Sequence, residues 1–431
     1  MTDGFIVIGL FALLLILIFL RLEIAFAIGL ISIVWLAISG QSGTIGVTRI
    51  FSGLDRFVLL AIPFFLLAGE LMNKSGVTSR LVDAANFTVG RFRGGLAQSN
   101  VGASLLFSGL SGAAVADVAA LGRIFIPSMA DNGYDRDFSA AVTAASSLVG
   151  PIIPPSIIIV VYGAVTGVSI GALFTAALIP GVLLGLGLMT TVAIIAKTSD
   201  LPKHEPDVDT SELPSLLFHT IVALSVPAVI LIGITQGYMT PTEAAAIASA
   251  YAFILGTVVY RSLNLSKIKS AFYVTVERTT QLYAIIGFSG LMIWILGREG
   301  VTRDLAAYVA DLGLGPILFL LLIAVILLFV GTWLEIGAAT ILLGPILADL
   351  AADVGIPDLQ FGIIFILTLN FGLITPPVGI CLFAASSVGE VPVWDISKKI
   401  LPFFVTNAAV LLLIMFIPEM TLALPERWGY I

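Results

Sequence analysis

The sequence predicts an all-α polytopic membrane protein built from two repeats of inverted topology, each with a re-entrant helical hairpin and a transmembrane helix broken by prolines. Composition is the first reason: 59% of the 431 residues are hydrophobic and 11% are charged, whereas soluble domains average about 25% charged residues. The second is that the apolar runs at 5–20 and 316–330 are continuous, unlike the alternating strands of a membrane barrel. The third is a glycine and proline motif that occurs at 150–156 and again at 372–378.

The first segments predict three spans and two helices at the membrane surface. We assign the spans to 4–20, 22–39 and 58–73, and the surface helices to 44–57 and 77–89, where charged residues interrupt the apolar ones. The first segment has no basic residue before it and no small-residue cleavage site after it. We therefore expect a retained span rather than a signal peptide.

A hairpin and a broken span follow. The sequence Ser108–Gly112 interrupts the segment 96–130, and each half of that segment is short for a crossing. We expect a re-entrant hairpin with its tip at this interruption. Segment 137–166 is a span broken at 150–156, and 170–196 is an intact span. Residues 1–196 thus form the first repeat, and the polar stretch 197–214 is a cytoplasmic linker.

The second half, residues 215–431, repeats this plan. We expect spans at 215–236, 241–260 and 279–296, with a basic connector at 261–278. The second hairpin covers 316–350, with its tip near Gly331-Thr332, and the second broken span covers 359–387. The last span is 394–416.

A shift of 222 residues aligns the two halves. It places Gly109 on Gly331, Gly150 on Gly372, and the pair Pro154-Pro155 on Pro376-Pro377 without a gap. Each half crosses five times on this plan, an odd number, so the two halves are inverted relative to each other. Internal duplication of this kind is the usual construction of secondary transporters.

The distribution of basic residues predicts the orientation. On this plan 15 of the 20 Lys and Arg residues lie on one face, and the remaining five lie on the other: Arg49, Arg56, Arg298, Arg303 and Arg427. The positive-inside rule makes the first face cytoplasmic. Both termini are then outside, the first hairpin enters from the cytoplasm, and the second enters from the opposite side.

The prolines predict oxygen ligands inside the membrane. A proline at position i frees the carbonyl at i−4, which here frees the carbonyls of Ser147, Gly150, Pro151, Gly372 and Leu373. The hairpin tips add hydroxyls and flexible backbone at Ser108, Gly109, Ser111, Gly331 and Thr332. A tip facing a break makes a small oxygen-lined cage suited to a hard cation such as Na⁺. The alternative that the prolines are only packing kinks stays open.

Two stretches resemble a known family. They are Phe107–Asp117, with the sequence FSGLSGAAVAD, and Asn370–Gly379, with the sequence NFGLITPPVG. They are similar to signatures of the large membrane subunit of tripartite ATP-independent periplasmic (TRAP) transporters, and the resemblance covers essentially the whole chain. It implies an elevator-type protein of the bacterial inner membrane that imports organic acids such as dicarboxylates, sialic acid and other sugar acids, driven by Na⁺. It also implies two partners: a soluble periplasmic binding protein and a small four-helix membrane subunit, here a separate polypeptide.

The resemblance also implies site residues. The first Na⁺ site would use the hairpin tip at Ser108, Gly109 and Ser111 with backbone near Gly150, Ile153 and Pro155. The second would use Gly331, Thr332 and Trp333 with Gly372, Thr375 and Pro377. Substrate candidates are Ser111, Glu335 and Asn370, although many family members carry Asp where Glu335 stands. Na⁺ is the only metal expected, with no organic cofactor and no nucleic acid.

The sequence leaves the role of some residues, and the function, open to other interpretations. Asp117 has three possible roles: a functional site, a hydrogen bond to the hairpin backbone, or an ion pair with Arg123. Glu243 follows Thr240-Pro241 and fits a helix start. A stand-alone Na⁺/organic-anion symporter without a binding protein is the alternative function. An intramembrane enzyme would need a nucleophile–base pair or metal ligands in the spans, and no such motif is evident. A channel suits broken helices and hairpins less well than occluded binding does.

Overall fold

The computed structural model describes residues 22–199, 201–202 and 213–431, with isolated positions between 9 and 20. The elements in the described residues are helices, which confirms the all-α prediction. By length and composition, seven of them are able to cross a membrane, or up to nine if each bent pair counts as one span. The predicted span 4–20 and the linker 197–214 fall largely outside the described residues.

The N-terminal elements follow the predicted segments. Helix α2 spans Ile24–Ile38, α3 spans Gly43–Leu54, and the short 3₁₀ helix η1 (Phe57–Leu60) leads into α4 (Ala61–Lys74). The Ser42 side chain accepts a hydrogen bond from the Thr44 amide and so caps α3. Helix α5 covers Val77–Val89 and starts after Gly76.

The first hairpin consists of α6 (Gly95–Ser111) and α7 (Ala114–Asp131). The break falls at Gly112-Ala113, at the C-terminal edge of the predicted tip. Gly112 has φ +61°, a left-handed conformation that glycine adopts without the steric cost of a Cβ atom. The chain can therefore reverse within two residues.

The first broken span consists of α8 (Arg136–Ser146), the 3₁₀ turn η2 (Ser147–Val149) and α9 (Ile157–Thr166). The peptide bond between Pro154 and Pro155 is cis, as is the bond between Pro376 and Pro377 in the second half. The Ser156 hydroxyl caps α9 by accepting from the Ile159 amide. Helix α10 (Ile170–Thr198) is the intact span that follows.

The second half begins with α11 (Leu213–Thr235) and α12 (Pro241–Ile254), which continues as a π turn over Leu255–Val259. The Thr240 and Glu243 side chains form a capping box at the start of α12, which confirms Glu243 as a helix-start residue.

The predicted division into a connector at 261–278 and a span at 279–296 is wrong. One helix of 34 residues, α13 (Leu265–Arg298), covers both. Its length is about 51 Å at 1.5 Å per residue, well beyond the hydrocarbon thickness of a bilayer. The Asn264 side chain caps its start, and no proline or glycine interrupts it before Gly287. The basic residues of 261–278 therefore extend the helix instead of ending it.

The remaining elements build the second hairpin and the second broken span. The hairpin is α15 (Pro316–Trp333) with α16 (Ile336–Asp353), preceded by α14 (Val301–Asp311). Each arm of this hairpin is also long and apolar enough to cross a membrane. The broken span is α17 (Asp358–Gly372) with α18 (Ile380–Gly389). The predicted last span 394–416 is divided into α19 (Val393–Lys399) and α20 (Leu401–Phe416), and α21 (Glu419–Arg427) follows at 60° to α20.

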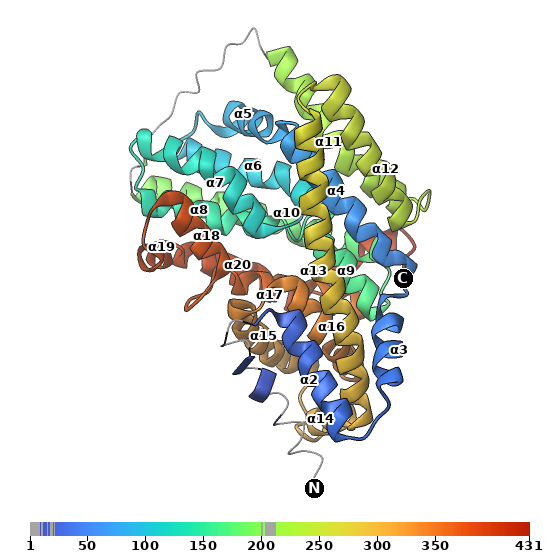
Figure 1. The fold of residues 1–431 in the computed structure, drawn as a ribbon. Helices are drawn as coiled ribbons and strands as arrows, with labels where there is room; N and C mark the ends of the chain where they lie inside the picture. Colours follow the sequence, from blue (N-terminus) through green and yellow to red (C-terminus); the bar gives the residue numbers. More distant parts are fainter. Residues whose placement is uncertain are drawn as a thin grey trace.

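The helices form two groups (Figure 1). Helix α13 runs the length of the molecule and packs with α2, α3 and α4, and α4 packs with α12; we call α2–α4 and α11–α13 the frame group. Helices α6–α10 and α15–α21 form the hairpin group. Helix α5 contacts α6 and α11, and α14 contacts α16 and α13, so each joins one hairpin to the frame group.

Packing within the hairpin group follows the 222-residue correspondence. Helix α7 of the first hairpin packs against α18 of the second broken span. In the same way, α16 of the second hairpin packs against α9 of the first broken span. The same exchange relates the α4–α12 contact to the α13–α2 contact. The orientation of the two halves in the membrane stays a prediction.

Candidate functional site

The first hairpin tip lies against the first break. A Cβ atom built on Gly109 would lie 3.6 Å from the Pro154 carbonyl oxygen and 2.9 Å from Pro227 of α11. A Cβ atom on Gly112 would lie 3.2 Å from the Ile157 amide nitrogen. A cavity of about 20 Å³ lies beside this contact, lined by Gly109 and Pro155 together with apolar side chains of α4 and α11. That volume is sufficient for one water molecule.

A buried polar ladder holds α6 against α8 and ends at the tip. The Asn100 amide donates to the Thr143 hydroxyl at 2.7 Å, and the Ser104 hydroxyl donates to the Ser146 hydroxyl at 2.9 Å. One turn further, Ser108 is fully buried and its hydroxyl donates to the Leu105 carbonyl at 2.7 Å. Ser111 is the last residue of α6, and its side chain lies outside the described part of the structure. The ladder was missed, although polar residues at four-residue spacing in an apolar segment are a signal for it.

Some of the carbonyls expected to be free in the first break already accept hydrogen bonds. The Ser147 carbonyl accepts from the Gly150 amide at 3.1 Å, and the Pro151 carbonyl accepts from the Ser156 hydroxyl. A carbonyl oxygen has two lone pairs, so each keeps a second position for a cation. The Ile153 side chain packs toward Gly181, and Pro155 is buried.

The second tip and the second break meet backbone to backbone. A Cβ atom built on Gly372 would lie 2.4 Å from the Gly331 carbonyl carbon, and one built on Gly331 would lie 2.5 Å from the Leu369 carbonyl oxygen. The Gly372 carbonyl accepts from the Thr375 amide at 3.0 Å, and the Leu373 carbonyl accepts from the Cys381 amide at 3.0 Å. The prediction that these two carbonyls are unpaired is therefore wrong; each has one partner and one remaining lone pair.

The hydroxyls at the second break bond to their own helices, each at 2.7 Å. Thr332 donates to the Phe329 carbonyl, and Thr375 donates to the Phe371 carbonyl. Trp333 is 43% exposed, so in this conformation the Trp333 side chain lies outside the packed interior.

The two breaks differ in how they are enclosed. Pro154 and Pro155 are buried, whereas Pro376 and Pro377 are exposed. The first break is thus sealed between the hairpin group and the frame helices α4 and α11, and the second is open.

The two remaining substrate candidates have different surroundings. Asn370 is fully buried; its amide nitrogen donates to the Leu148 carbonyl, and its amide oxygen is buried without a hydrogen-bond partner among the described residues. It lies between the two broken spans, with one acceptor available. Glu335 is exposed and caps α16, because its carboxylate accepts from the Ala338 amide at 3.0 Å. In this conformation the Glu335 carboxylate acts as the N-terminal cap of α16.

Asp117 lies at the first break. It is fully buried on the first turn of α7, and its carboxylate faces Gly150. Arg123 donates to the Ala119 carbonyl of its own helix at 2.9 Å. Cys381 of α18 is also fully buried and lies beside Ser147 and Asp117.

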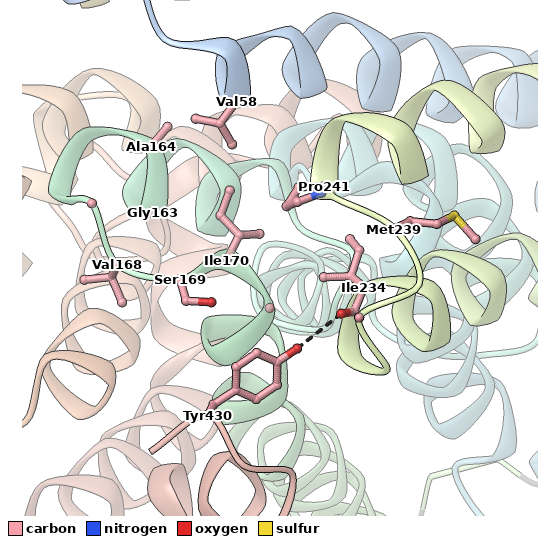
Figure 2. A pocket seen from close by; sticks show the side chains of 13 residues that line it. Val58, Gly163, Ala164, Val168, Ser169, Ile170, Ile234, Met239, Pro241 and Tyr430 are labelled. Atoms are coloured by element: carbon pink, nitrogen blue, oxygen red, sulfur yellow. Dashed lines mark hydrogen bonds between the residues drawn. The ribbon is translucent and has the colours of Figure 1, made fainter.

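A larger cavity lies between the two helix groups (Figure 2). Its volume is about 430 Å³, and it is lined by the loop from α9 to α10, Val58, the turn from α11 to α12, and Tyr430. Figure 2 shows the Tyr430 hydroxyl pointing at the end of α11, where it donates to the Ile234 carbonyl at 3.2 Å and the Thr235 carbonyl at 3.3 Å. Nearby, Arg56 donates to the carbonyls of Ala164 and Val165 at the end of α9. These contacts link distant segments, and no local sequence pattern predicts them.

Comparisons with known proteins agree with this architecture. The family model for the tripartite ATP-independent periplasmic transporter, DctM component, matches residues 11–420. The chain is 39% identical over 416 residues to the sialic acid TRAP transporter large permease protein SiaM of Vibrio cholerae, covering 96% of this chain and 97% of that protein. It is also 39% identical over 381 residues to the C4-dicarboxylate TRAP transporter large permease protein DctM of Pseudomonas aeruginosa, covering 88% and 89%.

A solved structure shares the fold at low identity. The YdaH transporter of Alcanivorax borkumensis, whose crystal structure has an unusual topology, aligns with a TM-score of 0.62 at 14% identity, covering 90% of this chain and 88% of that one. Its likeness concerns the fold alone. The family match and the two relatives place this multi-span membrane protein among transport permeases rather than enzymes. The chain belongs to the DctM family, the large membrane permeases of tripartite ATP-independent periplasmic transporters.

Proposed function

We propose that this chain is the large subunit of a Na⁺-coupled importer of an organic acid, working in the bacterial inner membrane. The observation that carries the proposal is the pairing of each hairpin tip with a proline break, at Gly109 with Pro154 and at Gly331 with Gly372. Broken helices near the bilayer midplane bind coupling ions through unwound carbonyls in secondary transporters.

The donor chemistry fits Na⁺ better than a transition metal. The cation ligands predicted at both breaks are carbonyls and hydroxyls, which are hard oxygen ligands without charge. Within the described residues, no group of three or more His, Cys, Asp or Glu is placed to hold a metal ion. Ser108 with Gly150, Ile153 and Pro155, and Thr332 with Gly372, Thr375 and Pro377, would supply oxygens, each from a hydroxyl or a backbone carbonyl.

The substrate class follows from the relatives. Their names give sialic acid in one case and C4-dicarboxylates in the other, at the same 39% identity, and both kinds of molecule carry a carboxylate. We propose a carboxylate substrate bound between the two breaks. The Asn370 amide oxygen has no hydrogen-bond partner among the described residues, and as an acceptor it would face a donor group of that molecule rather than its carboxylate.

Two partners complete the proposed transporter. They are a periplasmic binding protein that delivers the acid and a small four-helix membrane subunit, in keeping with the family. The exposed apolar residues of α2 and of the α11–α12 region, including Phe26, Ile33, Ile221 and Ile232, are available for lipid or for a membrane partner.

The experiment is uptake into proteoliposomes that contain the chain and its small subunit, with and without the binding protein. Uptake of the acid should need both an inward Na⁺ gradient and the binding protein. Uptake that is unchanged when K⁺ replaces Na⁺ contradicts the proposal that Na⁺ is the coupling ion. Na⁺-driven uptake without the binding protein instead supports a stand-alone symporter.

A further inference from the structure

Asp117 is a carboxylate that the oxygen cages leave without a role. It lies on the first turn of α7, its side chain is 0% exposed, and its amide donates to the Ala113 carbonyl at 3.1 Å. The N-terminal end of a helix carries partial positive charge. The first turn of α7 therefore places the Asp117 carboxylate at the positive end of this helix.

The carboxylate reaches the first break directly. A Cβ atom built on Gly150 would lie 2.4 Å from Asp117 Oδ2 and 3.2 Å from the Ser147 carbonyl oxygen. Any side chain at Gly150 would push the carboxylate away from the break, so glycine at this position keeps the two in contact. The predicted oxygen ligands of the first cage thus lie beside a carboxylate.

The second break has no equivalent charge. The residue 222 positions after Asp117 is Ala339. The glycine equivalent to Gly150 is Gly372, which meets the backbone of Gly331 instead of a carboxylate. The two breaks therefore share their proline geometry and differ by one buried carboxylate.

A buried carboxylate is stable when hydrogen bonds or a cation compensate its charge, and a cage of neutral oxygens binds a cation more tightly when a carboxylate is near. We propose that Asp117 is the positioning residue of the first cation site, raising the affinity for Na⁺ at the oxygens around Gly150 and making the two cation sites unequal. This inference rests on the proposed function.

The test is the variant Asp117→Asn, which removes the charge and keeps the shape of the side chain against Gly150. In proteoliposomes with the partner subunits, the Na⁺ concentration for half-maximal uptake should rise about tenfold, in line with the effect of one opposite charge within a few ångströms. The purified complex gives a second readout: the increase in Tm that Na⁺ produces relative to choline should shrink in the variant. The matched control is Asp131→Asn, which removes an exposed carboxylate from the other end of the same helix and should leave both readouts unchanged.

The outcomes separate this inference from the proposed function. If wild-type uptake needs Na⁺ and Asp117→Asn shows less than about a twofold change in half-maximal Na⁺, the inference is wrong and the proposed function stands. If wild-type uptake does not need Na⁺, both are wrong. Asp117→Ser is the second neutral variant should Asp117→Asn not fold. Failure of both variants to fold, in choline and in Na⁺ alike, would assign Asp117 to the fold and overturn the inference.

Discussion

The amide nitrogen of Asn370 donates to the carbonyl of Leu148, and the two residues are 222 positions apart. They therefore occupy equivalent positions under the 222-residue shift. Asn370 lies near the end of α17, and Leu148 lies in η2, just before the first break. One hydrogen bond thus joins the two broken spans at the point where each stops being helical.

The variant Asn370→Leu should destabilise the protein and abolish uptake. It leaves the Leu148 carbonyl buried without this donor, which costs about 1–3 kcal/mol, and it removes the acceptor proposed to face the substrate. Thermal unfolding in detergent and uptake in proteoliposomes measure the two effects. Asn407→Leu is the matched control, because the Asn407 amide is equally buried but has no hydrogen-bond partner in the described structure; this variant should be neutral or stabilising. Equal losses of stability and of uptake in the two variants would show that the effect does not come from the Asn370–Leu148 hydrogen bond.

Gly372→Ala should separate the second tip from the second break. The new methyl group would overlap the backbone of Gly331, because its carbon would lie only 2.4 Å from the Gly331 carbonyl carbon, so the tip has to move by a large fraction of an ångström. A displacement of this size at a binding site costs about a hundredfold in rate, which initial uptake rates will show. The control is Gly297→Ala, whose Cβ atom meets nothing within 4 Å and which should be neutral or slightly stabilising. Full uptake by Gly372→Ala would mean that the close approach of the tip is dispensable.

Tyr430→Phe should loosen the contact between the hairpin group and the frame group. The hydroxyl that bonds the Ile234 and Thr235 carbonyls is lost, and the cavity beside it opens. Burial raises the pKa of Tyr430, so the hydroxyl stays protonated and donates throughout the neutral range. A Val168→Cys reporter in the cavity wall should react several-fold faster with a maleimide when Tyr430→Phe is present, as expected for loss of about 1 kcal/mol.

Tyr238→Phe provides the control for that experiment, because Tyr238 lies in the neighbouring turn and is 78% exposed. Its reporter rate should equal that of the parent protein. If the Tyr430 variant also leaves the rate unchanged, the Tyr430 contact does not hold the two groups together.

The orientation in the membrane has its own test. A cysteine introduced by Arg427→Cys should react with an impermeant maleimide in intact spheroplasts, and one introduced by Ser199→Cys should react only after the membrane is opened. This follows from the excess of Lys and Arg on the face that carries Lys197. The reverse pattern would invert the assignment of both hairpins.

Local features were predictable from the sequence. Gly112 and the two proline pairs interrupt helices through their own backbone chemistry, so the first hairpin tip and the broken spans appear where glycine and proline place them. The second tip does not: Gly331 and Thr332 lie inside α15, and the chain turns at Leu334-Glu335. Thr240 and Glu243 form the predicted cap for the same reason. The error at 261–278 concerns a local signal too: a basic stretch before an apolar one was interpreted as a connector, whereas most of it is the first part of α13. Glu335 as a substrate residue stays a prediction.

Contacts between distant segments were not predictable. Each such contact depends on how two helices cross, and residue spacing along the chain does not predict the crossing. The examples are Asp117 with Gly150, Asn370 with Leu148, and Tyr430 with Ile234. The 222-residue shift predicted which segments are equivalent. It did not predict that equivalent glycines, Gly150 and Gly372, have different neighbours.

The sealed first break and the open second break have one more consequence. The repeats are equivalent in sequence position but not in conformation, since Pro154 and Pro155 are buried while Pro376 and Pro377 are exposed. If each residue took the backbone geometry of its equivalent 222 positions away, the first break would open and the second would close. If the two halves are inverted in the membrane, as the sequence predicts, that exchange would move the opening from one side of the membrane to the other. Under the proposed function, the two halves of the single chain would then be the templates for its two access states.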